Sequence, residues 1–188
     1  MREFVLFSRQ GFTSSRFKGL RDAGRLDTVY QCILMALFRS HGIRRDVIFH
    51  AFLNGPPSPP LHLVVDGAEL RDARVDEETW EVILRNALGR GAHPGVTVDK
   101  TTFQQFVRER AESGSQIYVL EEKGAHIRQT EIGPKPVFIL GDHVGLPRKD
   151  EGYALRYGTK LSLGKGRYLA ASCVDIINYE LDNRNAKD

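Results

Sequence analysis

Residues 136–147 read PVFILGDHVGLP, and this stretch decides the interpretation of the fold. The apolar run 136–140 predicts a buried strand, and Gly141 marks the point where that strand ends. Three predicted strands end in such loops, at 120–124, 140–147 and 161–167. Glycine lets the backbone approach a ligand closely, and parallel α/β sheets bind ligands beyond the carboxyl ends of their strands. We therefore expect one ligand site built from these three loops.

The segments around this stretch alternate between strand and helix patterns. Apolar residues with helical spacing between Leu26 and Phe38 predict a long amphipathic helix, and Asp22 is its expected N-cap. Strands are predicted at 3–8, 47–53, 61–66, 116–121, 136–140 and 159–163, helices at 76–88, 100–113 and 168–181, and a short helix or loop at 146–157. The alternation predicts an α/β fold in which helices flank a mainly parallel sheet, as a single domain over residues 1–188.

The composition is that of an ordinary globular chain. Hydrophobic residues make up 41% and charged residues 27% of the 188 positions. No apolar run reaches the roughly 18–20 residues that a membrane span needs. Cys32 and Cys173 are isolated and the six histidines are scattered singly, so we expect no metal site and no disulfide framework. These features favour a cytoplasmic protein.

Residues 164–169, GKGRYL, follow a predicted strand and open a predicted helix, as a dinucleotide fingerprint would. However, Leu169 stands where the third glycine of that fingerprint belongs, and only 19 residues follow it. A dinucleotide-binding unit needs a further strand and an acidic residue in that space. The pattern therefore argues against a Rossmann fold.

The chain resembles the SPOUT class of RNA methyltransferases at residues 136–143, PVFILGDH, and 161–164, LSLG, which precede an apolar final helix. The resemblance extends to the tRNA pseudouridine N1-methyltransferase (TrmY-type) family. The further motifs are MREFV at 1–5, AGRLD at 23–27, SHGIRRDV at 40–47, GAELR at 67–71, GRG at 89–91, PGV at 94–96 and NYELD at 178–182. It implies a C-terminal deep trefoil knot, a homodimer formed through the knot helices, and methylation of N1 of a pseudouridine in the TΨC loop of tRNA.

The same resemblance implies that S-adenosylmethionine binds in the three loops. The implied cofactor-binding residues are Leu120, Gly141, Leu161, Ser162, Leu163, Gly164 and Cys173. Leucines at strand ends suit the faces of an adenine; each one alone is more typical of a protein core, and it is the set of three loops that favours the cofactor. Cys173 is interpreted as a packing contact to the cofactor, since the sequence shows no base that would make it a nucleophile.

Methylation of pseudouridine requires loss of the N1 proton, so a base or an anion-stabilising cation is needed. Arg25 and Asp27 are the candidate catalytic pair; the alternative is a solvated helix start. Arg21, Arg44 and Arg45 belong to an arginine-rich region and are candidate RNA contacts; the alternative is a surface set neutralised by nearby aspartates. Two other functions stay open: methylation of another RNA such as rRNA, and RNA binding without catalysis.

Overall fold

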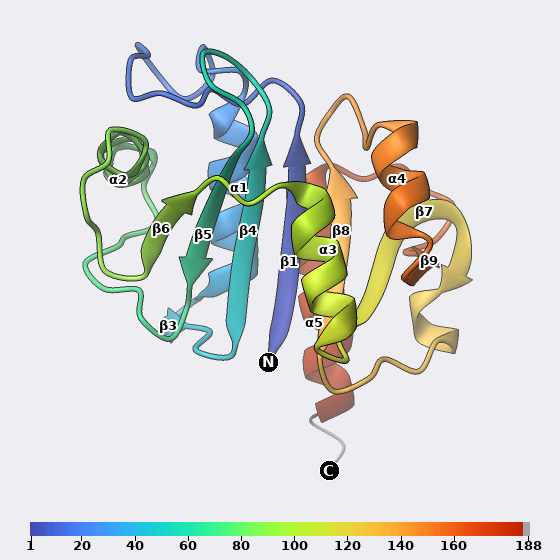
Figure 1. Cartoon of the computed structure of the whole chain (residues 1–188). Coiled ribbons are helices and arrows are strands. Elements are labelled where there is room, and N and C mark those ends of the chain that lie inside the picture. Colours follow the sequence, from blue (N-terminus) through green and yellow to red (C-terminus); the bar gives the residue numbers. More distant parts are fainter. Residues whose placement is uncertain (186–188) are drawn as a thin grey trace.

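In the computed structural model, which describes residues 1–185, seven strands form one sheet in the order β6-β5-β4-β1-β8-β7-β9 (Figure 1). The strands are β1 Arg2–Ser8, β4 Val47–Leu53, β5 Leu61–Asp66, β6 Val96–Asp99, β7 Gln116–His126, β8 Pro136–Gly141 and β9 Gly158–Ser162. Two short strands, β2 Phe38–Arg39 and β3 Gly42–Ile43, pair separately. Residues 186–188 of the expected domain lie outside the described residues.

The sheet is mostly parallel, which confirms the predicted α/β class. Strand β1 pairs in parallel with β4 and β8, and β7 pairs in parallel with β8 and β9. Only the β4–β5 and β5–β6 pairs are antiparallel. Strand β6 was not predicted, because its four residues at the sheet edge are too few to show a clear alternation. The parallel strands place all their carboxyl ends along one edge of the sheet.

Helices cover both faces of the sheet (Figure 1). They are α1 Leu26–Leu37, α2 Glu77–Leu88, α3 Phe103–Glu112, α4 Arg148–Ala154 and α5 Ala170–Asn185, with a 3-10 turn, η1, at Ile127–Gln129. Strand β1 is buried along its whole length. Its residues Phe4 and Leu6 join the cluster under α1, α2 and α5, while Val5 and Phe7 join the cluster under α3 and α4. Burial on both faces explains the continuous apolar runs of the central strands.

Helix α1 begins later than the sequence suggests, so the prediction that Asp22 is its N-cap is wrong. The residue before the helix is Arg25, whose φ of 68° is left-handed and which makes no side-chain cap. The preceding loop folds back on itself, since a Cβ on Gly24 would overlap the Gln10 carbonyl oxygen. This close approach delays the helix until Leu26 and leaves Asp22 exposed.

The last helix lies beside the first. Asn178 of α5 is fully buried, and its Nδ2 donates to the Met35 carbonyl of α1 at 2.8 Å. Its Oδ1 accepts from Arg2 Nη1 at 3.0 Å. Every polar group of this amide is thus engaged, which fixes α5 against α1 and the start of β1. The predicted helix 168–181 is observed two residues later and extends to Asn185.

Candidate active site

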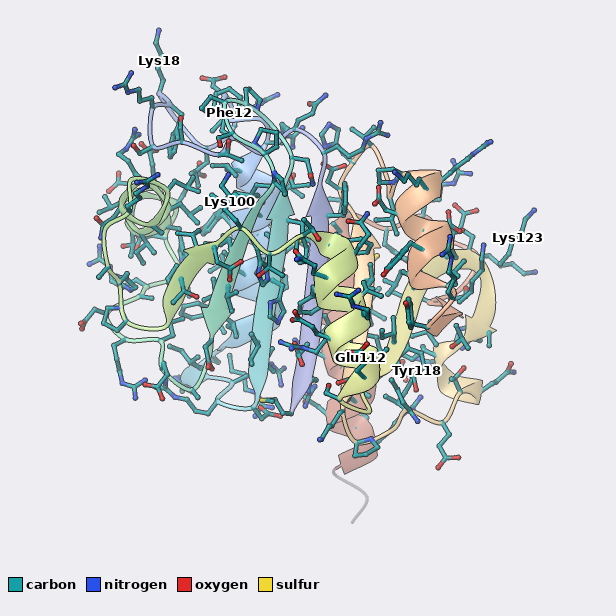
Figure 2. The ribbon with its side chains drawn as sticks, viewed as in Figure 1. Phe12, Lys18, Lys100, Glu112, Tyr118 and Lys123 are labelled. Carbon is teal, nitrogen blue, oxygen red and sulfur yellow. The ribbon has the colours of Figure 1, made fainter. Side chains whose placement is uncertain are left out.

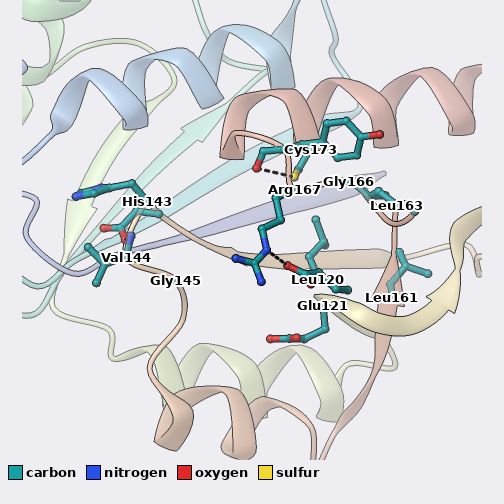
Figure 3. Close-up of a pocket in the computed structure, with 14 residues that line it drawn as sticks. Leu120, Glu121, His143, Val144, Gly145, Leu161, Leu163, Gly166, Arg167 and Cys173 are labelled. Carbon is teal, nitrogen blue, oxygen red and sulfur yellow. Dashed lines mark hydrogen bonds and ion pairs between the residues drawn. The ribbon is translucent and has the colours of Figure 1, made fainter.

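A cavity of about 390 Å³ lies at the carboxyl ends of β7, β8 and β9 (Figure 3). Its walls come from the three predicted loops and the first turns of α5. The lining residues are Leu120, Glu121, Glu122, Asp142, His143, Val144, Gly145, Leu161, Leu163, Gly164, Gly166, Arg167, Tyr168 and Cys173. This volume lies within the range of about 300–1,000 Å³ that is typical of small-molecule sites.

A bulge in β7 supplies the first wall. Leu120 and Ala125 both pair with Leu161 of β9, so residues 121–124 loop out of the ladder. Gly124 permits this, because an added Cβ would come within 2.6 Å of the Leu161 nitrogen. The bulge carries Glu121 and Glu122 to the cavity, and the strand continues to His126, beyond the predicted end at residue 121.

The loop after β8 supplies the second wall, and Asp142 holds it in place. One carboxylate oxygen of Asp142 accepts from Val144 N at 2.9 Å and the other from Arg9 N at 2.8 Å. Asp142 therefore joins its own loop to the segment that follows β1. Gly141 does not line the cavity; an added Cβ there would overlap the Leu146 nitrogen, so its role is to let the loop fold back.

The loop after β9 supplies the third wall. Ser162 Oγ accepts from Gly164 N at 3.1 Å, and Gly164 adopts a φ of 127° that other residues rarely reach. Arg167 crosses the cavity mouth and donates from Nε to Glu122 Oε1 at 2.6 Å (Figure 3). This ion pair links the third wall to the first.

Cys173 lines the cavity from the start of α5 (Figure 3). Burial raises the pKa of its thiol to about 11, so the group is protonated at neutral pH. A protonated thiol is a poor nucleophile, which agrees with the interpretation of Cys173 as a packing contact.

The structure brings five of the seven predicted cofactor residues together around the cavity: Leu120, Leu161, Leu163, Gly164 and Cys173. The other two, Gly141 and Ser162, shape the loops from behind. Glu122 and Tyr168 of the wall were not predicted as binding residues. Glu122 pairs with Arg167, which is 45 residues further along the chain. Glycines after strands were the signal that located the loops themselves.

Arg25 and Asp27 form a two-point ion pair, with Nε to Oδ1 at 2.9 Å and Nη2 to Oδ2 at 3.0 Å. The pKa of Arg25 is raised, first by the hydrogen bond to Asp27 and also by the charge of Asp142 on the cavity wall. Arg25 and Asp27 stand at the start of α1, which follows the carboxyl end of β1, so the predicted catalytic pair lies at the same edge of the sheet as the cavity (Figure 1). Asp27 is mostly buried and orients the half-exposed Arg25.

The predicted RNA contacts separate into two groups. Arg21 is exposed in the loop that connects β1 to α1, from which Lys18 extends outward (Figure 2). Arg44 and Arg45 lie just before β4, at the opposite edge of the sheet. One nitrogen of each contacts the protein: Arg44 Nη1 lies 2.7 Å from Asp182, and Arg45 Nη1 donates to the Gly67 carbonyl at 2.8 Å. The buried Nε of Arg44 has no hydrogen-bond partner among the described residues.

Within residues 1–185, no group of His, Cys, Asp and Glu side chains could hold a metal ion. No helix in the same range is long and apolar enough to cross a membrane.

The fold is an α/β sheet with a small-molecule cavity enclosed by its strand-end loops. A match to a family model shows which class of protein this is. Residues 1–186 match the family described as "Putative SAM-dependent RNA methyltransferase". The fold agrees: the Archaeoglobus fulgidus Nep1 structure bound to S-adenosylhomocysteine superposes with a TM-score of 0.61 at 15% identity, covering 87% of this chain and 72% of that one. The chain is thus an RNA methyltransferase that depends on S-adenosylmethionine.

Closer relatives narrow the family further. The tRNA (pseudouridine(54)-N(1))-methyltransferase of Methanocaldococcus jannaschii is 34% identical over 98% of this chain and 98% of its own length. The enzyme of the same name from Methanopyrus kandleri is 35% identical over 97% of this chain and 93% of its own. The chain belongs to this family of tRNA pseudouridine N1-methyltransferases.

The charges of the cavity suit the cofactor of this class. S-adenosylmethionine carries a sulfonium and an ammonium against one carboxylate, so its net charge is positive. The wall presents the carboxylates of Glu121, Glu122 and Asp142 against the single guanidinium of Arg167. Among residues 1–185, Glu121 has no hydrogen-bond or ion-pair partner of its own, which leaves its charge available to a cationic ligand.

Proposed function

We propose that this protein methylates N1 of a pseudouridine in the TΨC loop of tRNA; the names of its relatives describe methylation of N1 of pseudouridine 54 in tRNA. The observation that carries the proposal is the single acidic cavity formed by the three strand-end loops, with the Arg25–Asp27 pair on the same side of the molecule. A tRNA substrate also favours a cytoplasmic location.

The proposed cofactor contacts are the five cavity residues Leu120, Leu161, Leu163, Gly164 and Cys173, supported by Gly141 and Ser162. The leucines offer apolar surface to the faces of the adenine, and the exposed backbone of the glycine loops offers donors and acceptors to its edge. When bound, S-adenosylmethionine supplies an electrophilic methyl group attached to a sulfonium.

Arg25 and Asp27 are proposed to prepare the substrate base. Pseudouridine carries an N1–H that uridine lacks, and loss of that proton leaves negative charge on the ring. The Arg25 guanidinium would stabilise this charge, and Asp27, which grips two of its nitrogens, would hold it in position. Exposed Arg21 is proposed to contact the RNA backbone nearby. Nη1 of both Arg44 and Arg45 contacts internal partners at the far edge, which weakens their predicted role in RNA binding.

The proposal includes a single knotted domain that acts as a homodimer. The close approach of the loop after β9 to the loops of β7 and β8 around one cavity supports the trefoil knot. Exposed apolar side chains on the neighbouring helices α1 and α5 and beside Asp142 support a dimer through these elements: Met35, Tyr179 and Val144. Light scattering tests this, and a monomer at micromolar concentration would contradict it.

The test of the proposed function is nucleoside mass spectrometry on two matched tRNA transcripts. One carries pseudouridine in the TΨC loop and the other carries uridine at the same position. We expect N1-methylpseudouridine from the first and no methylation of the second. Methylation of an rRNA fragment in preference to either would assign the protein to the alternative substrate, and no methyl transfer to any RNA would support the non-catalytic alternative.

A further inference from the structure

We propose that an exposed basic surface on α3, α4 and the turn after α4, outside the cavity, binds the phosphate backbone of the substrate RNA. We call it the α4 basic surface; it consists of Arg108, Arg148, Lys149, Tyr153, Arg156 and Tyr157. The inference rests on the proposed function, because it names where the rest of that RNA substrate lies while its target base is at the cavity.

The four cations of this surface have unused donors. Arg108, Arg148, Lys149 and Arg156 are all exposed, and none makes a side-chain hydrogen bond or ion pair with any residue in 1–185. The carboxylates on the same helix are engaged elsewhere: Asp150 accepts from Gln104 at 2.5 Å and Glu151 from Lys160 at 2.9 Å. The carboxylates of α4 are thus engaged away from Arg148, Lys149 and Arg156, which leaves the positive charge of these three side chains facing solvent.

Aromatic rings lie among these cations. The Arg156 guanidinium lies 5.4 Å from the centre of the Tyr153 ring, and the Tyr153 and Tyr157 rings are 5.5 Å apart. The pKa of Tyr153 is raised, chiefly by the neighbouring Tyr157 hydroxyl, and the charges of Arg108 and Arg156 oppose that rise. Arg108 of α3 and Arg156 of the turn after α4 thus lie near one tyrosine, an arrangement that suits phosphates and unstacked bases together.

The surface continues directly from the cavity mouth. Gly145 lines the cavity, and α4 begins three residues later at Arg148. Lys149 and Tyr153 are one helical turn apart, and Gly152 between them carries no side chain to obstruct a ligand. An RNA whose base reaches the cavity would therefore have its neighbouring phosphates within reach of α4.

RNA fits this surface better than an acidic protein or a lipid membrane. No large aliphatic side chain of α4 is exposed, so the surface lacks the apolar element that membrane insertion needs. The surface also lacks the aliphatic pockets that would hold side chains of an acidic protein. It lies beside a cavity for methyl transfer to RNA, so the RNA substrate must come close to it. Phosphate contacts of this kind set affinity and its salt dependence, not sequence choice.

The test compares two double variants of equal charge change. Lys149→Gln/Arg156→Gln alters the α4 basic surface, while the control Arg74→Gln/Lys135→Gln alters exposed cations that do not line the cavity or lie on α4. The dissociation constant of pseudouridine-containing tRNA is measured between 50 and 200 mM salt. The dissociation constant rises with salt concentration. The slope of its logarithm against the logarithm of the salt concentration should be smaller by about 2 in the first variant and unchanged in the control.

A slope lower by that amount means that wild-type affinity falls about tenfold more than the variant's across this salt range. KM for tRNA should rise in the α4 variant, while kcat at saturating tRNA and the affinity for S-adenosylhomocysteine should not change. An α4 variant with the slope and KM of the control would overturn the inference. A wild-type protein that transfers no methyl group to pseudouridine would instead overturn the proposed function, whatever the slopes.

Discussion

The two edges of the sheet use their charged side chains in opposite ways. At the carboxyl edge, glycine loops enclose a cavity whose Glu121 has no protein partner among the described residues, and whose mouth is crossed by a mostly exposed Arg167. At the amino edge, Arg2 and Arg44 are buried and both contact Asp182, at 3.1 and 2.7 Å. An arginine count therefore does not identify a binding surface; what matters is whether the protein already occupies its donors.

The amino edge ties the first and last parts of the chain together. Asp182 on α5 accepts from Arg2, the first residue of β1, and from Arg44, which precedes β4. Arg39 reaches the same carboxylate at 3.4 Å from a more exposed position. The ion pairs of the amino edge therefore hold the fold together, whereas the carboxyl edge carries the candidate active site.

The largest expected effect lies at the carboxyl edge. Arg25→Ala should lower kcat for tRNA methylation by about 10²–10³-fold, because it removes a cation placed to stabilise developing negative charge. The matched change at the other edge, Arg44→Ala, should leave kcat of the folded protein close to wild type. Steady-state kinetics with saturating cofactor measures both, and equal losses of kcat would erase the contrast between the edges.

The next effect lies at the amino edge and concerns stability. Asp182→Ala should lower the free energy of unfolding by about 3 kcal/mol, because it leaves the Arg44 guanidinium without a carboxylate and leaves Arg2 with Asp46 alone, at 3.5 Å. Arg39→Ala removes an exposed partner of the same residue and should cost less than about 1 kcal/mol. Urea denaturation followed by circular dichroism gives both values. A small loss in Asp182→Ala would mean that the edge cluster is not structural.

A third set of charged groups, buried under α3, predicts a pH dependence of stability. His50 lies between Glu3 and His62, with ring nitrogens at 2.8 and 3.0 Å from these partners, and His62 contacts Asp99. Burial lowers the pKa of His62 to about 4, below the value of about 6.5 in an unfolded chain. Its contribution is thus present above pH 6.5 and lost as the pH falls toward 4.

Thermal unfolding at several pH values should therefore show stability falling between pH 6.5 and 4, by about 2 kcal/mol in total. His62→Gln should flatten this dependence, while His143→Gln, which changes an exposed histidine at the cavity, should not. A wild-type unfolding temperature that is constant across this range would refute the assignment.

A smaller effect is expected from the residue that joins two loops at the carboxyl edge. Asp142→Asn should raise the dissociation constant for S-adenosylhomocysteine by about tenfold, because the amide can accept from only one of Val144 N and Arg9 N with its oxygen. Calorimetry measures this, with Asp150→Asn on α4 as a control. Wild-type affinity in Asp142→Asn would show that this carboxylate does not shape the cavity.

The sequence predicts the central strands and amphipathic helices well, because long apolar runs and helical spacing can be recognised without knowing which elements pack against them. It also locates the three loops, since glycines such as Gly141 and Gly164 stand where strands end. It does not predict the β7 bulge, which depends on a close approach between Gly124 and Leu161. Nor does it show that Arg44 is engaged, because its partner Asp182 is 138 residues away in the chain.

The central claim is that the carboxyl-edge cavity holds the cofactor, and calorimetry with S-adenosylhomocysteine tests it most directly. Wild-type protein should bind at sub-millimolar concentration. Gly164→Trp should not bind, because it places a bulky side chain in the cavity wall at a backbone φ of 127°, while helix content by circular dichroism stays unchanged. Absence of binding in the wild type, or unchanged binding in Gly164→Trp, would contradict the claim.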